Sequence, residues 1–214
     1  MIRPDPLLGF FYDDARVVRL AAGAPWFEKP NDLNVFGVRR PDARGAFDDV
    51  IVWAFTHPKG VGVAFKAPAT TDPSRKWLRT PLNPAGCAIL VPGHYPRSHV
   101  LGTHRGRPGM VQDAPMRIWR DNNRDDVAAP TTEILPAPAL VRINIHDAIG
   151  ADAGEAASAG CQVFQYTSHL TGFLGSVRAQ SNAGLGTHVS YTLVDPNNLT
   201  GAAREAAMRL LGAS

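Results

Sequence analysis

Proline and glycine residues divide this 214-residue chain into short segments along its whole length. The sequence contains 18 prolines and 20 glycines, which stand in small groups between runs of β-branched and aromatic residues. Proline disrupts helices and glycine favours turns, so long uninterrupted helices are not expected over most of the chain. The pattern predicts strands joined by turns and long loops, and it argues against a helical bundle.

The expected strands are apolar runs bounded by turn residues. They cover residues 15–20, 33–40, 48–56, 60–66, 87–95, 98–104, 115–121, 140–146 and 187–195. Residues 67–86 and 122–139 are rich in Pro, Thr and Asp, which predicts a long surface loop for the first and a polar connection for the second.

Two helices are expected near the C-terminus. Thr167 or Ser168 can cap the first, whose buried face is formed by Leu170, Phe173, Leu174 and Val177, with Gly184 after its end. Asn198 or Thr200 can cap the second, whose buried face is formed by Ala203, Ala207, Leu210 and Leu211. No domain boundary is evident, so residues 1–214 are expected to form a single mainly β domain with a few helices (α+β).

Charge and hydropathy exclude several partners. The net charge is +3, with no run of five or six like charges, so no nucleic-acid partner is expected. No apolar stretch approaches the length of a membrane span. The N-terminus lacks the apolar core of a signal peptide, so we expect synthesis in the cytoplasm, where Cys87 and Cys161 stay free thiols.

The segment from residue 141 to residue 161 holds the main candidate for chemistry. Apolar and polar residues alternate from Val141 to His146, which puts His146 on the polar face at the end of a strand. A cysteine attacks carbonyls as thiolate, and a nearby imidazole can supply the base. Cys161 follows the small residues Ser158, Ala159 and Gly160, so the amides of Gly160 and Cys161 are candidate oxyanion donors. Cys87, by contrast, opens an apolar run and is expected to be structural.

Other titratable residues have weaker patterns. His94, His99 and His104 are spaced by five, but no carboxylate or thiol accompanies them as a zinc ligand, so no metal is expected. An alternative pair is Cys87 with one of these histidines. In that pair the cysteine precedes the histidine in the chain, as in papain-like hydrolases, whereas His146 precedes Cys161. Asp147 should point to the opposite strand face from His146. Arg105 and Arg107 are candidates to bind a peptide carboxylate. Residues 120–126 are expected to be a solvated turn, because the spacing of a calcium loop is missing.

The His146 and Cys161 segments resemble a known family. The motif "INIH", with fourteen residues between His146 and Cys161, followed by "SAGC", is similar to the signature of YkuD-type L,D-transpeptidases. The stretches "GCAILVPGHYPRSHVLGTHRGRPGMVQ", "IWRDNNRDD" and "SAGCQVF" resemble the phage-type branch, in which Gln follows the cysteine. The likeness covers roughly residues 70 to 195.

The resemblance implies a β-sandwich or barrel-like catalytic domain that forms a cysteine acyl-enzyme with peptidoglycan stem peptides, without a cofactor. It implies that Cys161 is the nucleophile, His146 the base, Gly160 and Cys161 the oxyanion donors, and Ser158 the residue that shapes the turn. His104 matches a histidine of the phage-type branch and is expected, with Arg105, to contact substrate. Hydrolysis would give an L,D-carboxypeptidase or endopeptidase, and aminolysis an L,D-transpeptidase.

Two departures from the family keep a second hypothesis open. Ala159 stands where cell-wall members usually carry His or Lys, and Val163 stands where they carry Arg. The missing arginine makes cleavage better supported than cross-linking, and it supports the alternative of a non-catalytic module that binds cell wall or a phage particle. A leaderless member fits a phage lysis protein or a secreted effector that acts on the cell wall after release or delivery. The oligomeric state stays open.

Overall fold

The computed structural model describes residues 6–41, 46–128, 138–148 and 158–212. Ten strands and four α-helices form there, which confirms a mainly β, α+β chain. The strands are β1 (Asn34–Val38), β2 (Asp49–Thr56), β3 (Gly62–Thr70), β4 (Cys87–Leu90), β5 (Gly93–His104), β6 (Arg107–Gln112), β7 (Ile118–Asp121), β8 (Ile145–Asp147), β9 (Gln162–Phe164) and β10 (His188–Val194). The helices are α1 (Pro6–Ala21), α2 (Arg75–Arg79), α3 (Thr167–Asn182) and α4 (Gly201–Leu211), with a 3₁₀ turn, η1 (Pro196–Asn198), before α4.

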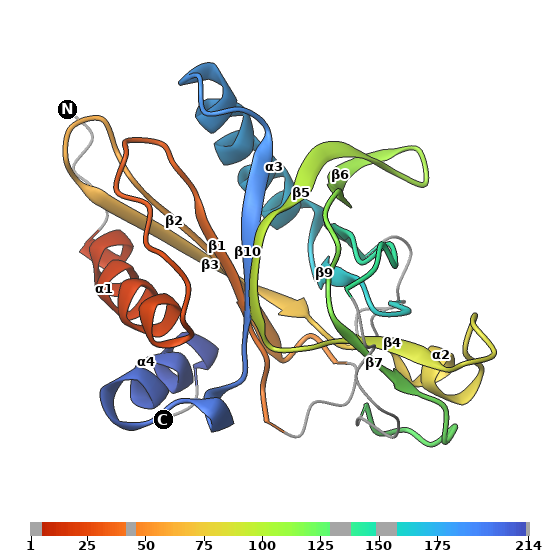
Figure 1. Cartoon of the computed structure of the whole chain (residues 1–214). Coiled ribbons are helices and arrows are strands. Elements are labelled where there is room, and N and C mark those ends of the chain that lie inside the picture. The colour runs from red at the N-terminus through yellow and green to blue at the C-terminus, as the bar shows by residue number, and fades with distance from the viewer. Residues whose placement is uncertain (1–5, 42–45, 129–137, 149–157, 213–214) are drawn as a thin grey trace.

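Eight strands form a closed ring of hydrogen-bonded pairs. Their order is β1-β10-β5-β6-β8-β9-β3-β2, and β2 pairs with β1 to complete the ring. Most pairs are antiparallel, but β1 pairs with β10 and β8 with β9 in parallel. Strands β4 and β7 form a separate two-stranded sheet, which lies beside β9 in Figure 1.

Strands β1 and β2 are buried on both faces because each contributes to two apolar clusters. Val35 and Trp53 belong to the cluster that α3 covers with Phe173, whereas Phe36 and Val52 belong to the cluster of α1 and α4. Successive side chains on a strand point to opposite faces, so the unbroken apolar runs of β1 and β2 supply both clusters.

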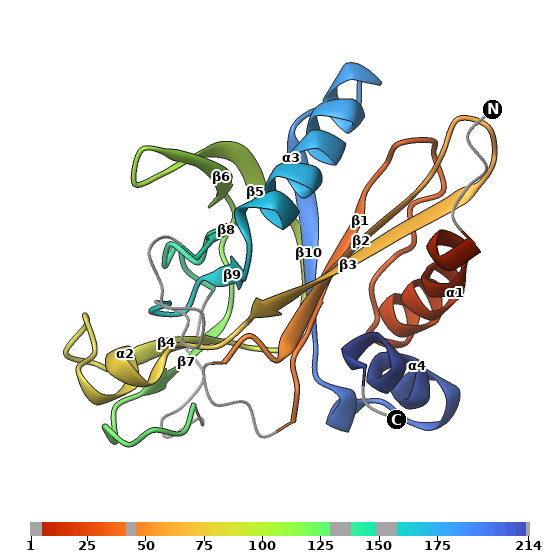
Figure 2. The ribbon, with the colours of Figure 1, turned by 180° about the vertical axis from the view of Figure 1, so that it is seen from behind.

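The helices divide between two sides of these strands. Helices α1 and α4 contact each other and lie together against β1 to β3, while α3 lies on the other side, above β8 and β9 (Figure 2). The predicted buried face of α3 is confirmed, with Gln180 added to it. Helix α4 buries Ala207, Leu210 and Leu211 as predicted, with Ala206 rather than Ala203 as the other buried alanine. Tyr166 rather than Thr167 or Ser168 is the residue before α3, and Thr200 precedes α4, both without a side-chain cap bond.

Three secondary-structure predictions were wrong or too broad. Residues 15–20 belong to α1, where Ala15 and Val18 are buried at helical spacing, so they form no strand. Residues 67–86 are only partly a surface loop, because residues 69–74 are buried and α2 follows them. Of residues 140–146, only Ile145 and His146 lie in a strand, and Arg142 has a left-handed φ of 61°. No helix within the described ranges is both long and apolar enough to cross a membrane.

Candidate active site

The parallel pairing of β8 with β9 brings the predicted histidine and cysteine together. His146 is the middle residue of β8 and lies opposite Val163 of β9 in the register. Cys161 immediately precedes β9, two residues before Val163, so strand alternation puts Cys161 on the same side as Val163. All three residues line one cavity.

The cavity has a volume of about 810 Å³, which is within the usual range for a small-molecule or short-peptide site. Its wall is built from β4, from the β5 to β6 turn, from the segment that leads into β8 and from the loop before β9. The predicted site residues His104, Arg105, His146, Ser158, Gly160 and Cys161 all line it. The predicted site residues therefore share one surface, although the first and last of them, His104 and Cys161, are 57 residues apart in sequence.

Ser158 holds the loop that carries the cysteine. Its hydroxyl donates to the carbonyl of Cys161 (2.7 Å) and accepts from the N–H of Gly160 (3.1 Å). Its own carbonyl accepts from the N–H of Ser74 (2.7 Å), which ties the loop to the segment after β3. These bonds agree with a turn-shaping role for Ser158. They also occupy the N–H of Gly160, so this amide does not serve as an oxyanion donor in this conformation.

Gly160 is small because it packs against β4. Its φ is +126°, and a Cβ placed there would lie 2.4 Å from the carbonyl oxygen of Ala88. Both the left-handed backbone and the close approach require glycine. The sequence suggested that the small residues of this loop let a substrate approach the backbone. At Gly160 the small residue instead makes room for β4.

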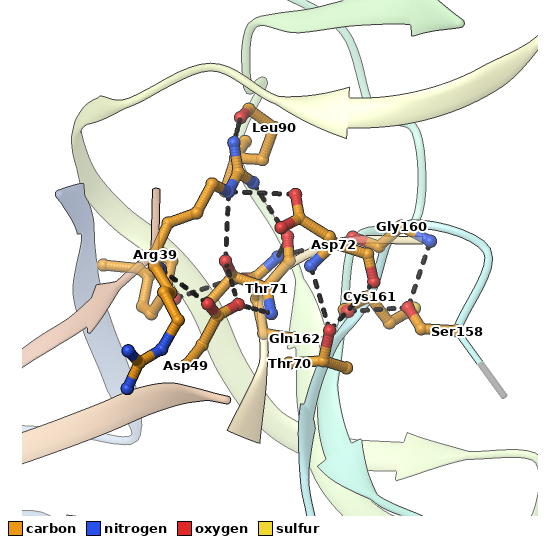
Figure 3. A network of polar contacts seen from close by, with 12 residues as sticks. Arg39, Asp49, Thr70, Thr71, Asp72, Leu90, Ser158, Gly160, Cys161 and Gln162 are labelled. Atoms are coloured by element: carbon orange, nitrogen blue, oxygen red, sulfur yellow. Dashed lines mark hydrogen bonds and ion pairs between the residues drawn. The ribbon is translucent and has the colours of Figure 1, made fainter. Parts of the chain in front are cut away.

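A buried polar network lies under the cysteine loop (Figure 3). The side chain of Gln162 donates to the carbonyls of Gly160 (3.3 Å) and Thr71 (3.5 Å) and accepts from the hydroxyl of Tyr191 (2.8 Å). Gln162 is fully buried, and buried amides need such partners. The residue after the cysteine thus anchors the loop to β10 and to the segment that follows β3.

The same network continues into two buried carboxylates and one arginine. Arg39 donates to the carbonyls of Thr71 (2.8 Å) and Leu90 (3.0 Å) and pairs with Asp72 (2.9 Å). Asp49 accepts from the N–H (2.6 Å) and the hydroxyl (2.7 Å) of Thr71. Burial and the neighbouring Asp72 raise the pKa of Asp49 to about 7. Removing one member of such a network leaves a buried group unpaired, so the loop rests on a rigid support.

The ring of His146 is held in one tautomer. Its Nδ1 lies 2.7 Å from the backbone carbonyl of Asp147. A carbonyl only accepts hydrogen bonds, so Nδ1 carries the proton and Nε2 keeps its lone pair. Burial lowers the pKa of His146, and the nearby His104 and Arg105 act in the same direction. The neutral imidazole is therefore the favoured form at neutral pH.

Cys161 is a half-buried thiol whose Sγ lies within 4.8 Å of a ring nitrogen of His146. Burial raises its pKa, while the N–H of Asn144 and the charge of Arg105 lower it. Its Sγ lies 3.4 Å from the carbonyl of Arg142. With the thiol pKa raised and the histidine pKa lowered, the resting pair is neutral thiol and neutral imidazole.

His104 and Arg105 reach the site from the turn between β5 and β6. The rings of His104 and His146 stack, with centroids 4.6 Å apart and planes 21° apart. Arg105 and Gly106 connect paired residues His104 and Arg107, and both have positive φ (50° and 77°), as in a type I′ turn. Arginine rarely adopts this conformation, and strained residues of this kind often mark functional sites.

Asp147 and Arg107 pair with each other away from His146. Arg107 Nη2 lies 2.7 Å from Asp147 Oδ2, which also accepts from the hydroxyl of Thr167 (2.6 Å). Asp147 therefore orients His146 through its backbone carbonyl and joins β8 to β6 and α3 through its side chain. Arg107 is engaged in this ion pair, which leaves Arg105 as the better candidate for a substrate carboxylate.

The structure separates the three evenly spaced histidines by their surroundings. His104 lines the cavity, whereas His94 contacts Thr192 (3.0 Å) and His99 is fully buried against Ser98 (3.0 Å). In the described chain, a nitrogen of His104, a nitrogen of His146 and Sγ of Cys161 lie within 4.8 Å of one another, the spacing of a possible metal site. Residues 120–126 include a solvated turn held by Asn123 and Asp125, as the sequence predicts.

Two polar residues that sequence reasoning missed support these rings. Asn144 accepts from the N–H of Gln112 (2.9 Å) and contacts Nδ1 of His104 (2.9 Å). The side chain of Gln112 accepts from the N–H groups of Val141 (3.1 Å) and Ile143 (2.9 Å), which holds the irregular segment before β8. Asn144 alternates with apolar residues in the sequence, a pattern that predicted exposure, but it is buried.

Comparison with models of known protein families gives no match. Comparisons with curated proteins and with solved structures give none either.

Proposed function

We propose that this chain is a cysteine-dependent acyl-transfer enzyme with Cys161 as nucleophile and His146 as base. The observation that carries the proposal is the meeting, in one cavity, of a half-buried thiol and an imidazole whose Nδ1 is held by a backbone carbonyl. A nucleophile beside an oriented base is the arrangement that covalent catalysis requires. Cys87 in β4, by contrast, is a buried cysteine whose Sγ contacts the loop carbonyl of Ala159 (3.8 Å).

The reaction begins from the neutral pair. His146 Nε2 takes the thiol proton as Sγ bonds to the substrate carbonyl carbon, and the π electrons move to the carbonyl oxygen. When the carbonyl re-forms, the bond to the leaving amine breaks and the amine takes the proton from His146. Water or a second amine then attacks the thioester, again with His146 as base. With the N–H of Gly160 bonded to Ser158, the N–H of Cys161 is the loop amide proposed to face the oxyanion.

We propose peptidoglycan stem peptides as the substrate class. This rests on the resemblance of the His146 and Cys161 segments to YkuD-type L,D-transpeptidases. The cavity volume of about 810 Å³ suits a short peptide, and Arg105 at its edge is a partner for a terminal carboxylate. The scissile bond would be the one before a terminal D-amino acid, and the cell wall would be the place of action.

The acceptor depends on the surroundings of Val163. This residue lies opposite His146 and is 1% exposed in the folded chain. Because it is apolar where cell-wall members of the family carry arginine, the site offers no cation at this position to hold an acceptor carboxylate. Hydrolysis is therefore the better supported outcome, giving an L,D-carboxypeptidase or endopeptidase.

Digestion of defined muropeptides tests the proposal. The wild-type chain should release D-amino acids or shortened peptides, as detected by mass spectrometry. Cys161→Ala should stop this release, and Cys87→Ala, which alters the other cysteine beside the cavity, should retain it. Equal products from wild type and Cys161→Ala would overturn the cysteine mechanism.

A non-catalytic cell-wall module is the second candidate. The raised pKa of Cys161 favours it, because less of the thiol is then present as the nucleophilic thiolate. The apolar Val163 favours it because this side chain cannot bind a substrate carboxylate. In that case the chain should sediment with purified peptidoglycan sacculi and leave their muropeptide composition unchanged, for wild type and Cys161→Ala alike.

A further inference from the structure

The hydrogen bonds around His104 fix which of its ring nitrogens carries the proton. The backbone N–H of Gln112 donates to Asn144 Oδ1 (2.9 Å), so the amide nitrogen of Asn144 is the atom that faces His104. An amide NH₂ only donates, so Nδ1 of His104 accepts this bond at 2.9 Å. In a neutral imidazole the proton is then on Nε2, the nitrogen that this bond leaves free. Burial and the nearby Arg105 lower the pKa of His104, which keeps the ring neutral.

The free Nε2 atoms of His104 and His146 therefore carry opposite groups. His146 keeps a lone pair on Nε2 because its Nδ1 donates to the carbonyl of Asp147. His104 keeps a proton on Nε2 because its Nδ1 accepts from Asn144. The rings stack at 4.6 Å, and a nitrogen of each lies within 4.8 Å of Sγ and of the other. One acceptor and one donor beside a nucleophile are the two groups that acyl transfer needs.

A second observation gives the donor a task. The N–H of Gly160, which the loop would otherwise present to an oxyanion, is bonded to the hydroxyl of Ser158 (3.1 Å). An oxyanion hole usually holds two or more hydrogen-bond donors. Of the two amides proposed for this role, Gly160 and Cys161, only the N–H of Cys161 is then left, so a second donor is needed. His104 lies on the cavity wall and is held by the buried Asn144, so its N–H is preorganised.

We infer that His104 is a further catalytic residue, whose Nε2–H donates to the oxyanion formed when Cys161 attacks a carbonyl, and that Asn144 is the positioning residue that sets its tautomer. The inference rests on the proposed acyl transfer at Cys161. It concerns only a hydrogen bond to the carbonyl oxygen, so the proton inventory of the reaction is unchanged: the thiol proton still passes to His146 and then to the leaving group.

The same tautomer argues against reading the three residues as a resting metal site. A metal needs a lone pair on each coordinating nitrogen, and a ligating histidine usually donates through its other nitrogen. His146 meets this condition through Asp147. His104 does not, because Asn144 presents hydrogens to its Nδ1. Replacing Asn144 by aspartate would present an acceptor instead, moving the ring proton to Nδ1 and leaving Nε2 with a lone pair.

Two reagents separate the role of His104 from that of the base. Alkylation of Cys161 by iodoacetamide forms no oxyanion, whereas acylation by p-nitrophenyl acetate does. His104→Ala should lower the acylation rate by about 10²-fold, the usual loss for one oxyanion donor, and should leave the alkylation rate within about threefold because His146 is intact. His104→Gln, which restores an N–H at a similar reach, should recover part of the acylation rate. His188→Ala, whose ring pairs with Asp113 outside the cavity, is the matched control and should change neither rate.

Asn144→Asp tests the tautomer itself. At pH 8 it should slow acylation nearly as much as His104→Ala and should let Zn²⁺ protect Cys161 from alkylation at lower concentrations than in the wild type. Long-range ¹H–¹⁵N spectra of the His104 ring should show the proton on Nε2 in the wild type and on Nδ1 in Asn144→Asp.

Equal losses of acylation and alkylation in His104→Ala, no loss of acylation, or a proton on Nδ1 in the wild type would each overturn the inference. Normal acylation by the ester together with no action on muropeptides would instead count against the proposed substrate, and the role of His104 would stand.

Discussion

Cys87 and Cys161 border the same cavity, yet they are held in opposite ways. Cys87 begins β4 within an apolar strand, is 3% exposed, and has a pKa raised to about 11, chiefly by burial. Cys161 ends a loop of small residues that is fixed by Ser158 and Gln162, and it lies beside two histidines. Apolar packing surrounds the first thiol, whereas a loop held by hydrogen bonds sets the second beside two imidazoles.

The largest expected effect is the difference in reactivity between the two thiols. At pH 8 a thiol of pKa near 11 is ionised to only about one part in 10³, and Cys87 is also shielded by packing. Cys161 is also largely un-ionised at rest, but His146 can take its proton as Sγ attacks, so we expect iodoacetamide to modify Cys161 more than about 10²-fold faster than Cys87, as followed by peptide mass spectrometry. His146→Ala should remove most of this advantage. Similar slow rates at both cysteines in the wild type would show that the surroundings of Cys161 do not activate it.

A smaller effect is expected from disturbing the cysteine loop without touching its chemistry. Gly160→Ala forces a Cβ to within 2.4 Å of the Ala88 carbonyl at a φ of +126°, so the loop must shift. A displacement of about 1 Å can cost roughly 10²-fold in rate, which we expect for acylation of Cys161.

Gly175→Ala is the matched control for this variant. Gly175 lies in α3, where an added Cβ meets nothing within 4 Å, and alanine favours helix. It should leave the acylation rate unchanged and keep or raise the melting temperature. A Gly160→Ala protein with wild-type acylation would show that the loop geometry is not needed.

The smallest effect concerns the charge of Arg105. This charge helps to lower the pKa of His146, so the base stays neutral below the ordinary histidine pKa of about 6.5. In Arg105→Gln the pKa of His146 should rise, so that more of the base is protonated at pH 6 and the acylation rate there falls, by less than about threefold. The rates should converge at pH 8.

Arg97→Gln controls for the loss of an arginine with positive φ, because Arg97 has a φ of 46° and does not line the cavity. Its pH profile of acylation should match that of the wild type. An unchanged acid limb in Arg105→Gln would remove Arg105 from the electrostatics of the site.

The sequence predicted those parts of the molecule that depend on local pattern. Helix α3 was identified from Leu170, Phe173, Leu174 and Val177, whose spacing marks one helical face. Residues 15–20 were misread because Val17, Val18 and Leu20 resemble a strand when read alone. Their helix begins at Pro6, a residue favoured in a first helical turn, and is covered by α4 from the far end of the chain.

The site divides in the same way. His146, Cys161 and Ser158 could be found from one short segment, since their chemistry depends on their type and order. Asn144, Gln112 and Arg39 could not be found, because their roles arise from contacts with residues 29 to 51 positions away in sequence. The sequence also assigned Gly160 to substrate contact, whereas β4 and Ser158 occupy its surroundings.

Trapping the acyl-enzyme tests the central claim most directly. Wild-type protein mixed with a defined muropeptide, quenched in acid within one turnover and digested, should yield the peptide that contains Cys161 carrying the donor acyl group, with the terminal amino acid lost. The adduct should be absent from Cys87 and should form far more slowly in His146→Ala. Product release without an adduct on Cys161, or an adduct on Cys87, would contradict the account.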